Sequence, residues 1–431
     1  MKLLFKILIL FLIVFNFKIP YFYNTVFLSI LLSGLYYIFD RKTVPFTYFT
    51  YKYNIVIIVG TLAVAFIIFT ITTLHEQYSF TMIRRLLVQL SMLFAVIFAF
   101  PIFVEGDKSN AYEKVLTIIC YTFALQGLIH LSGYLFPAWG DYLISIKPQD
   151  LQDLIYDPER NVDLFRGYAL SGSIFFELPS AYGVAVIMFI RLQLIEGQEY
   201  ITGYKSFIVF LLLISGIMLS GRIGFVGVGI GVVLYFFFIK DPVIALKRVI
   251  KSSLVFIPVI LIIYFLILTP AQRWSFQEEL FPFAFEFFYN YEETGELRTH
   301  SSDATLYSFY YPLMDETLIK GHGIDNIYQL LRMYPFTDAG YMKSLLFGGI
   351  PYLICLLIYQ FLYFYQPISI ASKINTKESK IDLIFFISLY VYILLLHYKD
   401  VALGMQHLTE VLFLSIGLSY LIKYYSKPEE S

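Results

Sequence analysis

Long apolar runs separated by short polar stretches make up most of this chain. A helix that crosses the hydrocarbon core of a bilayer needs roughly 20 mostly apolar residues. By that measure the pattern predicts about twelve membrane helices, at residues 3–17, 21–39, 54–74, 86–104, 111–136, 174–195, 207–219, 223–239, 254–268, 345–365, 383–397 and 402–423. The predicted fold is therefore an all-α integral membrane protein.

These helices divide the chain into three predicted regions. Residues 1–269 hold nine helices and an external loop near 137–173, residues 270–342 form a long external loop, and residues 343–431 hold three helices and a tail. No small-residue cleavage site follows the first apolar run, and a second run begins almost at once. We therefore expect residues 3–17 to be a membrane helix and not a cleaved signal peptide.

Lysine positions predict the orientation of the chain. When the connections are assigned alternately to two sides, most lysines fall on the side that holds both termini, and the positive-inside rule makes that side cytoplasmic. Five lysines fall on the other side: Lys18, Lys147, Lys320, Lys343 and Lys399. We expect a multi-pass protein with both termini in the cytoplasm.

Arginine shows the opposite distribution. The arginines on the external side are Arg84, Arg85, Arg160, Arg166, Arg222, Arg273, Arg298 and Arg332, and three others fall inside. A guanidinium is planar, permanently charged and binds phosphate or carboxylate through paired hydrogen bonds. The external arginines therefore indicate a phosphorylated or carboxylated ligand, although pairing with loop Asp and Glu residues would account for some of them.

Composition supports the membrane assignment and excludes some functions. The chain is 58% hydrophobic and 15% charged, and its mean hydropathy is +0.71, which is far above that of a soluble domain. A net charge of -1 without a basic tail excludes nucleic-acid binding. Cys120 and Cys355 lie inside apolar runs and are expected to be packing residues. The histidines have no metal-ligand spacing, so we predict no metal and no cofactor.

The first motif is FRGYALSGSIFFELPSAYG, at residues 165–183. Arg166 precedes an apolar helix, Glu177 lies about one turn into it, and Pro179 follows. An acid within a membrane helix costs several kcal/mol unless it is paired or faces water. Glu177 is therefore a candidate functional residue; the alternative is an interfacial acid that caps a helix with a late start.

The second motif is MLSGRIGFVGVGIG, at residues 218–231. Two apolar helices meet here with almost no loop, and Arg222 lies at their junction. Glycines at 224, 227, 229 and 231 allow close approach of a neighbouring backbone, which would hold the turn and its guanidinium rigidly. The alternative is an arginine that only anchors the helix end at the interface.

The third motif runs from GHGID to TDAGYMKSLLFGG, at residues 321–349. It contains His322, Arg332 and Asp338 before an apolar run. Thr337 or Asp338 can cap the next helix, which would explain the acid without any further role. The Arg84 and Arg85 pair, and Arg298 in the stretch ELRTHSSDATLY, are additional polar features of the predicted external side.

Together these motifs resemble the O-antigen polymerase and ligase superfamily of bacterial envelope proteins. Members share many membrane helices, a long external loop late in the chain, an S-R-x-G turn and a late block GxG, D-S-G-Y and GG. Here the turn has Gly221 in the serine place, and the block has Ala339 in the serine place. The ligase branch usually carries a histidine and asparagine pair before the last block. This chain reads TDAGY there, which is typical of the polymerase branch.

The resemblance implies a membrane glycosyltransferase. It would join oligosaccharide repeat units carried on undecaprenyl pyrophosphate into O-antigen or capsular polysaccharide, at the periplasmic face of the bacterial inner membrane, by inverting and metal-independent transfer. Its partners would be the lipid-linked donor and acceptor, membrane lipid and a chain-length regulator protein. Alternatives are a ligase that transfers polymer to the lipid A core, and a flippase or transporter of the lipid-linked sugar.

Roles for the candidate residues follow from that chemistry. Negative charge grows on the pyrophosphate as the glycosidic bond breaks, so fixed guanidiniums stabilise the transition state more than the ground state. We expect Arg166 and Arg222 to do this, and Glu177, Asp338 and His322 compete as the group that takes the proton of the acceptor hydroxyl. The predicted catalytic set is Arg166, Glu177, Arg222 and Asp338. The predicted substrate-binding set is Arg84, Arg85, Tyr182, Arg298, His322, Arg332 and Tyr341.

Overall fold

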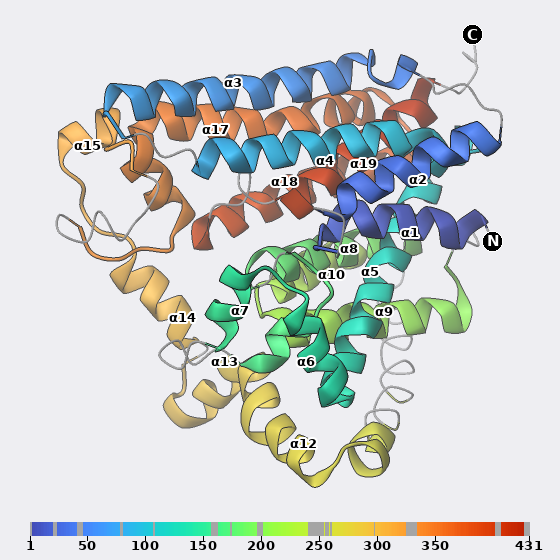
Figure 1. Ribbon diagram of the computed structural model, residues 1–431, viewed down its shortest axis with the longest axis vertical. Helices are drawn as coiled ribbons and strands as arrows, with labels where there is room; N and C mark the ends of the chain where they lie inside the picture. Colours follow the sequence, from blue (N-terminus) through green and yellow to red (C-terminus); the bar gives the residue numbers. More distant parts are fainter. Residues whose placement is uncertain are drawn as a thin grey trace.

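The computed structural model describes most of the chain as helices joined by short connections (Figure 1). It leaves undescribed residues 1, 20–23, 41–45, 78–80, 107, 157–162, 173–174, 196–200, 240–253, 255–257, 259–260, 297, 325–333, 401–406 and 426–431. No β-strand occurs in the described ranges. The described part of the chain is therefore all-helical, as the apolar runs predict.

Six helices among the described residues are long and apolar enough to cross a membrane. They are α3 (Lys52–Leu74), α4 (Thr81–Phe103), α5 (Ala111–Leu135), α9 (Gly203–Ser220), α17 (Gly340–Lys373) and α18 (Lys377–Lys399). Five further helices coincide with predicted spans: α1 (Lys2–Phe15), α2 (Thr25–Phe39), α8 (Glu177–Gln193), α10 (Gly224–Phe238) and α19 (His407–Tyr425).

The total of twelve spans stays a prediction. Helix α1 has 14 residues, so at 1.5 Å per residue it is about 21 Å long and shorter than the hydrocarbon core of a bilayer. Most of the predicted span at 254–268 lies outside the described residues. An apolar run thus locates a helix well, but a run of this length does not decide whether the helix crosses the bilayer.

Polar contacts show which helix termini lie together at one end of the bundle. Lys2 Nζ at the start of α1 lies 3.3 Å from Glu105 Oε1, just after α4. Near the end of α19, Lys423 Nζ lies 2.6 Å from Glu113 Oε1 at the start of α5 and also pairs with Glu378 at the start of α18. We call this the Lys423 end; the N-terminus of the chain lies there (Figure 1).

The opposite end, the Arg222 end, collects the other termini of the same helices. Leu408 N–H in α19 donates to Glu177 Oε1 at the start of α8 (3.0 Å), and Lys343 Nζ in α17 lies 3.0 Å from Asp400 Oδ1 after α18. The termini of these helices therefore alternate between the two ends, as the predicted connections require. Which end faces the cytoplasm stays a prediction.

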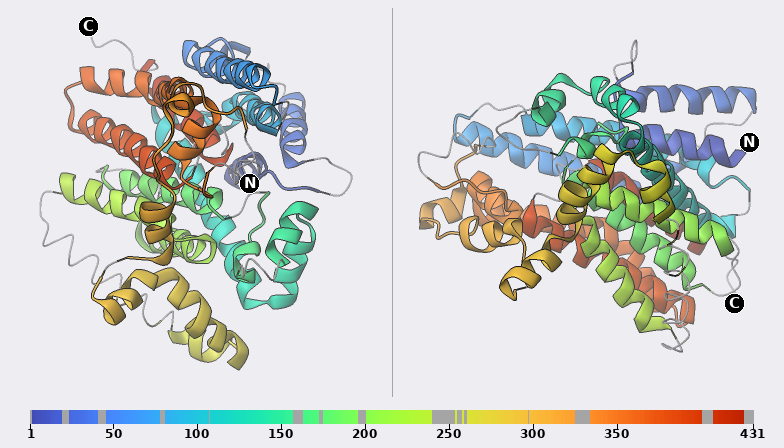
Figure 2. Two further views of the ribbon diagram at one scale, coloured as in Figure 1. Left: turned by 90° about the vertical axis from the view of Figure 1, so that its left-hand side faces the viewer. Right: turned by 90° about the horizontal axis from the view of Figure 1, so that it is seen from below.

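Short helices fill the two long predicted external segments. The first holds α6 (Pro137–Ser145) and α7 (Gln149–Tyr156), and the second holds α12 (Pro270–Ser275), α13 (Phe281–Thr294), α14 (His300–Asp303) and α15 (Asp315–Lys320). Figure 2 shows α12 and α13, in yellow, beside the green helices that follow α5. A small apolar cluster that includes Tyr134, Phe165, Leu219 and Leu280 joins these segments to the ends of α5 and α9.

Glycines bring α8 and α10 into close contact. A Cβ on Gly227 would lie 2.5 Å from the Cα of Gly183, and one on Gly231 would lie 2.4 Å from Ile190 Cδ1. This confirms the predicted close approach at these positions, whereas Gly229 faces open space. The packing fixes the start of α10, and with it the turn that carries Arg222.

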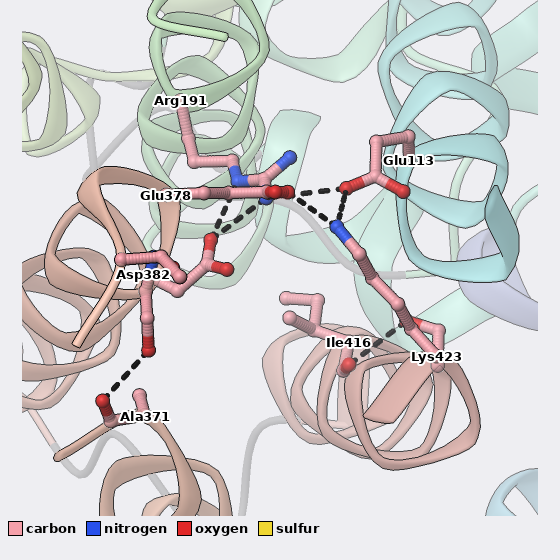
Figure 3. Close-up of polar contacts among 10 residues, drawn as sticks. Glu113, Arg191, Ala371, Glu378, Asp382, Ile416 and Lys423 are labelled. Atoms are coloured by element: carbon pink, nitrogen blue, oxygen red, sulfur yellow. Dashed lines mark hydrogen bonds and ion pairs between the residues drawn. The ribbon is translucent and has the colours of Figure 1, made fainter. Parts of the chain in front are cut away.

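A buried ionic cluster ties four helices together at the Lys423 end (Figure 3). Arg191 of α8 donates to Asp382 Oδ1 of α18 from Nη2 (2.7 Å) and Nε (2.9 Å), and its Nη2 lies 3.3 Å from Glu113 Oε1 of α5. Lys423 of α19 completes the cluster by pairing with Glu113 and with Glu378. The side chains of Arg191 and Glu113 are fully buried. Their charges are therefore balanced by one another and by the other members of the cluster, and not by water.

Candidate functional site

Arg166 and Arg222 both lie against one aromatic ring at the Arg222 end. Arg166 lies in a short 3-10 helix (Leu164–Gly167), and Arg222 lies in the turn between α9 and α10. Their Cζ atoms are 5.1 Å and 4.9 Å from the centroid of the Phe283 ring in α13. Arg166 also lies 4.9 Å from the Phe175 ring. Cation–π contacts of this kind position guanidiniums without neutralising them.

The end of α9 fixes Arg166 as well as Arg222. Arg166 Nε donates to the carbonyl of Ser220, the last residue of α9 (3.2 Å). The last carbonyls of a helix have no partner within the helix and carry its negative dipole end, so a guanidinium is favoured there. Two residues later the chain presents Arg222. One helix terminus therefore sets the relative positions of both arginines.

Burial strengthens the electrostatics of this pair. Burial lowers the pKa of Arg166 to about 10; Asp163 opposes this shift and the charge of Arg222 adds to it. Burial also lowers the pKa of Arg222, against the opposing charge of Asp163. Both guanidiniums remain protonated at neutral pH. Two fixed positive charges at a partly desolvated position attract an anion more strongly than the same charges in water.

Glu286 of α13 occupies this position in the structure. Its carboxylate forms an ion pair with Arg222, and the preceding residue, Phe285, interrupts the helical geometry of α13 with φ -118 and ψ 25. Glu286, Phe283 and Asp163 were not among the predicted site residues. One signal was present: Glu286 is the only charged residue in the aromatic run 281–291. A phosphate oxygen that bound Arg222 would take the place of this carboxylate.

Glu177 begins a helix and does not lie one turn inside it. Helix α8 starts at Glu177, because Pro179 is favourable in the first turn but not further along. The carboxylate accepts a hydrogen bond from the Leu408 backbone N–H at the start of α19. The prediction of an acid within the helix is therefore wrong, and the late helix start of the alternative is confirmed. The capping role of that alternative is not, because α8 has no side-chain cap hydrogen bond and Glu177 accepts from α19 instead.

Asp338 is not the cap of the helix that follows it. Thr337 Oγ accepts from the Ala339 N–H (3.1 Å) and donates to the Phe309 carbonyl (2.9 Å). Asp338 Oδ1 instead lies 3.2 Å from Lys343 Nζ, and its side chain is about half exposed. Its charge, together with those of Asp400 and Arg222, acts on the Lys399 ammonium. Asp338 and Arg222 thus both lie within electrostatic range of Lys399, an ammonium on which burial has the largest effect.

The two glycine motifs around His322 form one structural unit. Gly321 and Gly323 have φ of +64 and +69, and the N–H groups of His322 and Gly323 donate to Leu346 O and Phe347 O (both 2.8 Å). Helix α17 is broken just after these carbonyls, at Gly348 and Gly349. The first motif therefore satisfies backbone groups that the broken helix leaves open.

His322 itself is held in a hydrogen-bond network. Its Nε2 lies 3.1 Å from Thr317 Oγ, which also contacts the Tyr334 hydroxyl (2.7 Å). Burial lowers the pKa of His322, and the nearby His75 lowers it further. Both effects favour the neutral imidazole, one nitrogen of which is engaged by Thr317.

The remaining candidates lie apart from the arginine pair. Tyr182 is fully buried between Phe123 and Gly216, so it offers no exposed surface to a sugar. The Tyr341 hydroxyl donates to Leu394 O (3.0 Å). Arg298 pairs with Glu296 and lies 3.6 Å from Asp303 Oδ2, as the alternative of loop pairing predicts.

The other three arginines of the predicted binding set are Arg84, Arg85 and Arg332. Arg84 and Arg85 are exposed in the first turn of α4. Arg332 lies outside the described residues. Within the described ranges, no three His, Cys, Asp or Glu residues are grouped so that they could hold a metal ion.

No protein-family model, curated protein or solved structure matches the chain. The resemblance to the O-antigen polymerase superfamily therefore rests on the motifs quoted above. What the structure adds is the arrangement of those motifs, with the arginines of two of them converging on one ring.

Proposed function

We propose that the chain is a polysaccharide polymerase of the O-antigen polymerase type in the bacterial inner membrane, with both termini cytoplasmic. It would join oligosaccharide units carried on undecaprenyl pyrophosphate, by inverting and metal-independent glycosyl transfer. One observation carries the proposal: Arg166 and Arg222 converge on Phe283. They do so at the end of the bundle where both long polar segments lie, which suits an anionic leaving group attached to a membrane lipid.

In the proposed reaction, the acceptor hydroxyl oxygen attacks the anomeric carbon of the donor sugar from the side opposite the pyrophosphate. The bond from that carbon to the pyrophosphate oxygen breaks, and the electron pair leaves with the lipid pyrophosphate. Arg166 and Arg222 would stabilise the growing negative charge. Glu286 pairs with Arg222 in the structure, so in this mechanism it must give way when the pyrophosphate binds.

Asp338 is the proposed acceptor of the hydroxyl proton. Glu177 is engaged by a backbone N–H of α19, and His322 is engaged by Thr317. Asp338 is about half exposed, and it pairs with Lys343, which also binds Asp400. Its carboxylate is therefore the most accessible of the three candidates.

Asp338→Asn is expected to lower polymer formation about 100-fold or more, which is the usual contribution of a general base. The fold should persist, because Lys343 keeps Asp400. Polymer is measured on gels of surface polysaccharide, with protein amount measured by immunoblot. Asp400→Asn is the matched control because it removes the other carboxylate from Lys343. Equal losses in both variants would assign the effect to the lysine bridge.

Deletion of the gene tests the proposed function as a whole. A polymerase deletion should leave single repeat units on the lipid carrier and on the surface acceptor. A full ladder of chain lengths in the deletion strain would refute the proposal. Long chains that accumulate on the carrier would indicate a ligase, and substrate trapped on the cytoplasmic side would indicate a flippase.

A further inference from the structure

A partly open cavity of about 230 Å³ lies at the Lys423 end of the bundle, between the start of α3, the end of α17 and the end of α19. Lys52, Lys373, Tyr51, Tyr365, Gln366 and Ser369 are among its lining residues. We call it the Lys52–Lys373 pocket. It lies at the end opposite the arginine pair, so the proposed glycosyl transfer makes no use of it.

The pocket is located where a membrane meets water. Lys52 is the first residue of α3 and Lys373 is the last residue of α17, and both helices are long and apolar enough to cross a membrane. Tyrosines are enriched at this depth of a bilayer because one end of the ring is apolar and the hydroxyl is polar. Tyr51, Tyr53, Tyr365 and Tyr425 all line the pocket.

The charge of the pocket is positive and uncompensated by its lining, which contains no acidic residue. Both lysines are exposed. In the described part of the chain, the ion pairs at this end involve Lys2, Arg191 and Lys423, and neither Lys52 nor Lys373 takes part in one. Two ammonium groups beside a hydroxyl and an amide form a set of donors for an anionic oxygen group.

We propose that the Lys52–Lys373 pocket binds the phosphate headgroup of an anionic membrane lipid. Basic pockets between membrane helices on the cytoplasmic side bind such headgroups, and the lysine distribution predicts that this end is cytoplasmic. The volume is below the range of roughly 300–1,000 Å³ that holds a drug-sized ligand. It therefore suits a headgroup whose acyl chains remain in the bilayer along α3, much of whose surface is exposed outside the helix packing.

The test uses the full chain, purified in detergent and stripped of lipid. Phosphatidylglycerol, zwitterionic phosphatidylethanolamine and soluble glycerol phosphate are titrated separately, and bound ligand is counted by native mass spectrometry. We expect phosphatidylglycerol to bind most tightly. Each lysine near an anionic surface contributes about 1 kcal/mol, so the Lys52→Gln, Lys373→Gln double variant should bind it about 30-fold more weakly.

Two further variants separate a built pocket from general surface charge. Ser369→Trp fills the cavity and keeps both lysines, so it should also lose most of the binding. The matched control is Lys205→Gln with Lys380→Gln, which removes two exposed lysines from the starts of α9 and α18 outside the pocket; its affinity should stay within about twofold. The proposal fails if the control pair loses as much binding as the pocket pair, or if Ser369→Trp binds normally. It also fails if glycerol phosphate binds as tightly as the lipid, which would assign the pocket to a soluble phosphate, or if no probe binds.

Discussion

Arg222→Ala is expected to abolish polymer while the protein remains in the membrane at its normal level. The guanidinium is held by the turn between α9 and α10 and faces Phe283 and Glu286. Loss of one fixed group that stabilises developing negative charge typically lowers the rate by about 100-fold to 1,000-fold. Gels of surface polysaccharide, with an immunoblot for the protein, measure both quantities. Normal polymer from this variant would remove Arg222 from the mechanism.

Two companion variants separate the function of Arg222 from its structural contact. Arg222→Lys keeps the charge but loses the planar, paired donors, so we expect poor rescue. Arg222→Glu combined with Glu286→Arg restores an ion pair of reversed polarity between the turn and α13. If Arg222 only anchors α13, the double variant should recover polymer. If Arg222 binds the leaving group, the double variant should stay inactive although the protein is folded.

Arg191→Met is expected to destabilise the folded protein by about 3–5 kcal/mol, because it removes one partner of a buried ionic cluster. The change would leave Glu113, Glu378 and Asp382 with Lys423 as the one remaining cation of the cluster. Thermal unfolding of the detergent-purified protein, followed by light scattering or an intrinsic fluorescence signal, measures the loss.

A second arginine serves as the control for that experiment. Arg84 is exposed in the first turn of α4, so Arg84→Met should change stability by no more than about 0.5 kcal/mol. Combining Arg191→Met with Asp382→Leu should recover part of the loss, since a buried charge then no longer lacks a partner. If Arg191→Met unfolds at the same temperature as Arg84→Met, the cluster does not stabilise the fold.

The sequence predicted the helices well because apolar runs and membrane helices share the same length scale. The run at 111–136, for example, became α5 with nearly the same bounds. Boundaries were less predictable where a few residues decide them. Pro179 moved the start of α8 to Glu177. At the start of α17, Ala339 took the capping position that the pattern allowed for Thr337 or Asp338, and it has no side-chain cap hydrogen bond.

The sites were only partly predictable, because contacts between distant elements leave no local pattern. The arginine bias predicted that Arg166 and Arg222 share one side, but not that both contact Phe283. Glu286 lies in a segment that the pattern described as a loop, so its pairing with Arg222 could not be predicted from the sequence. Arg191 and Asp382 are 191 positions apart, and nothing in either neighbourhood indicates the other. Tyr182 was chosen for its residue type, and packing placed it in the core instead.

The ionic cluster also imposes an order on how the protein is made. A ribosome completes α8, with Arg191, long before it reaches Glu378, Asp382 and Lys423. During that interval Glu113 is the one cluster partner already synthesised, at 3.3 Å in the finished structure. The nascent chain must therefore carry a half-paired guanidinium at the membrane boundary until the final two helices arrive. Assembly of this end is consequently completed only after α18 and α19 have been synthesised.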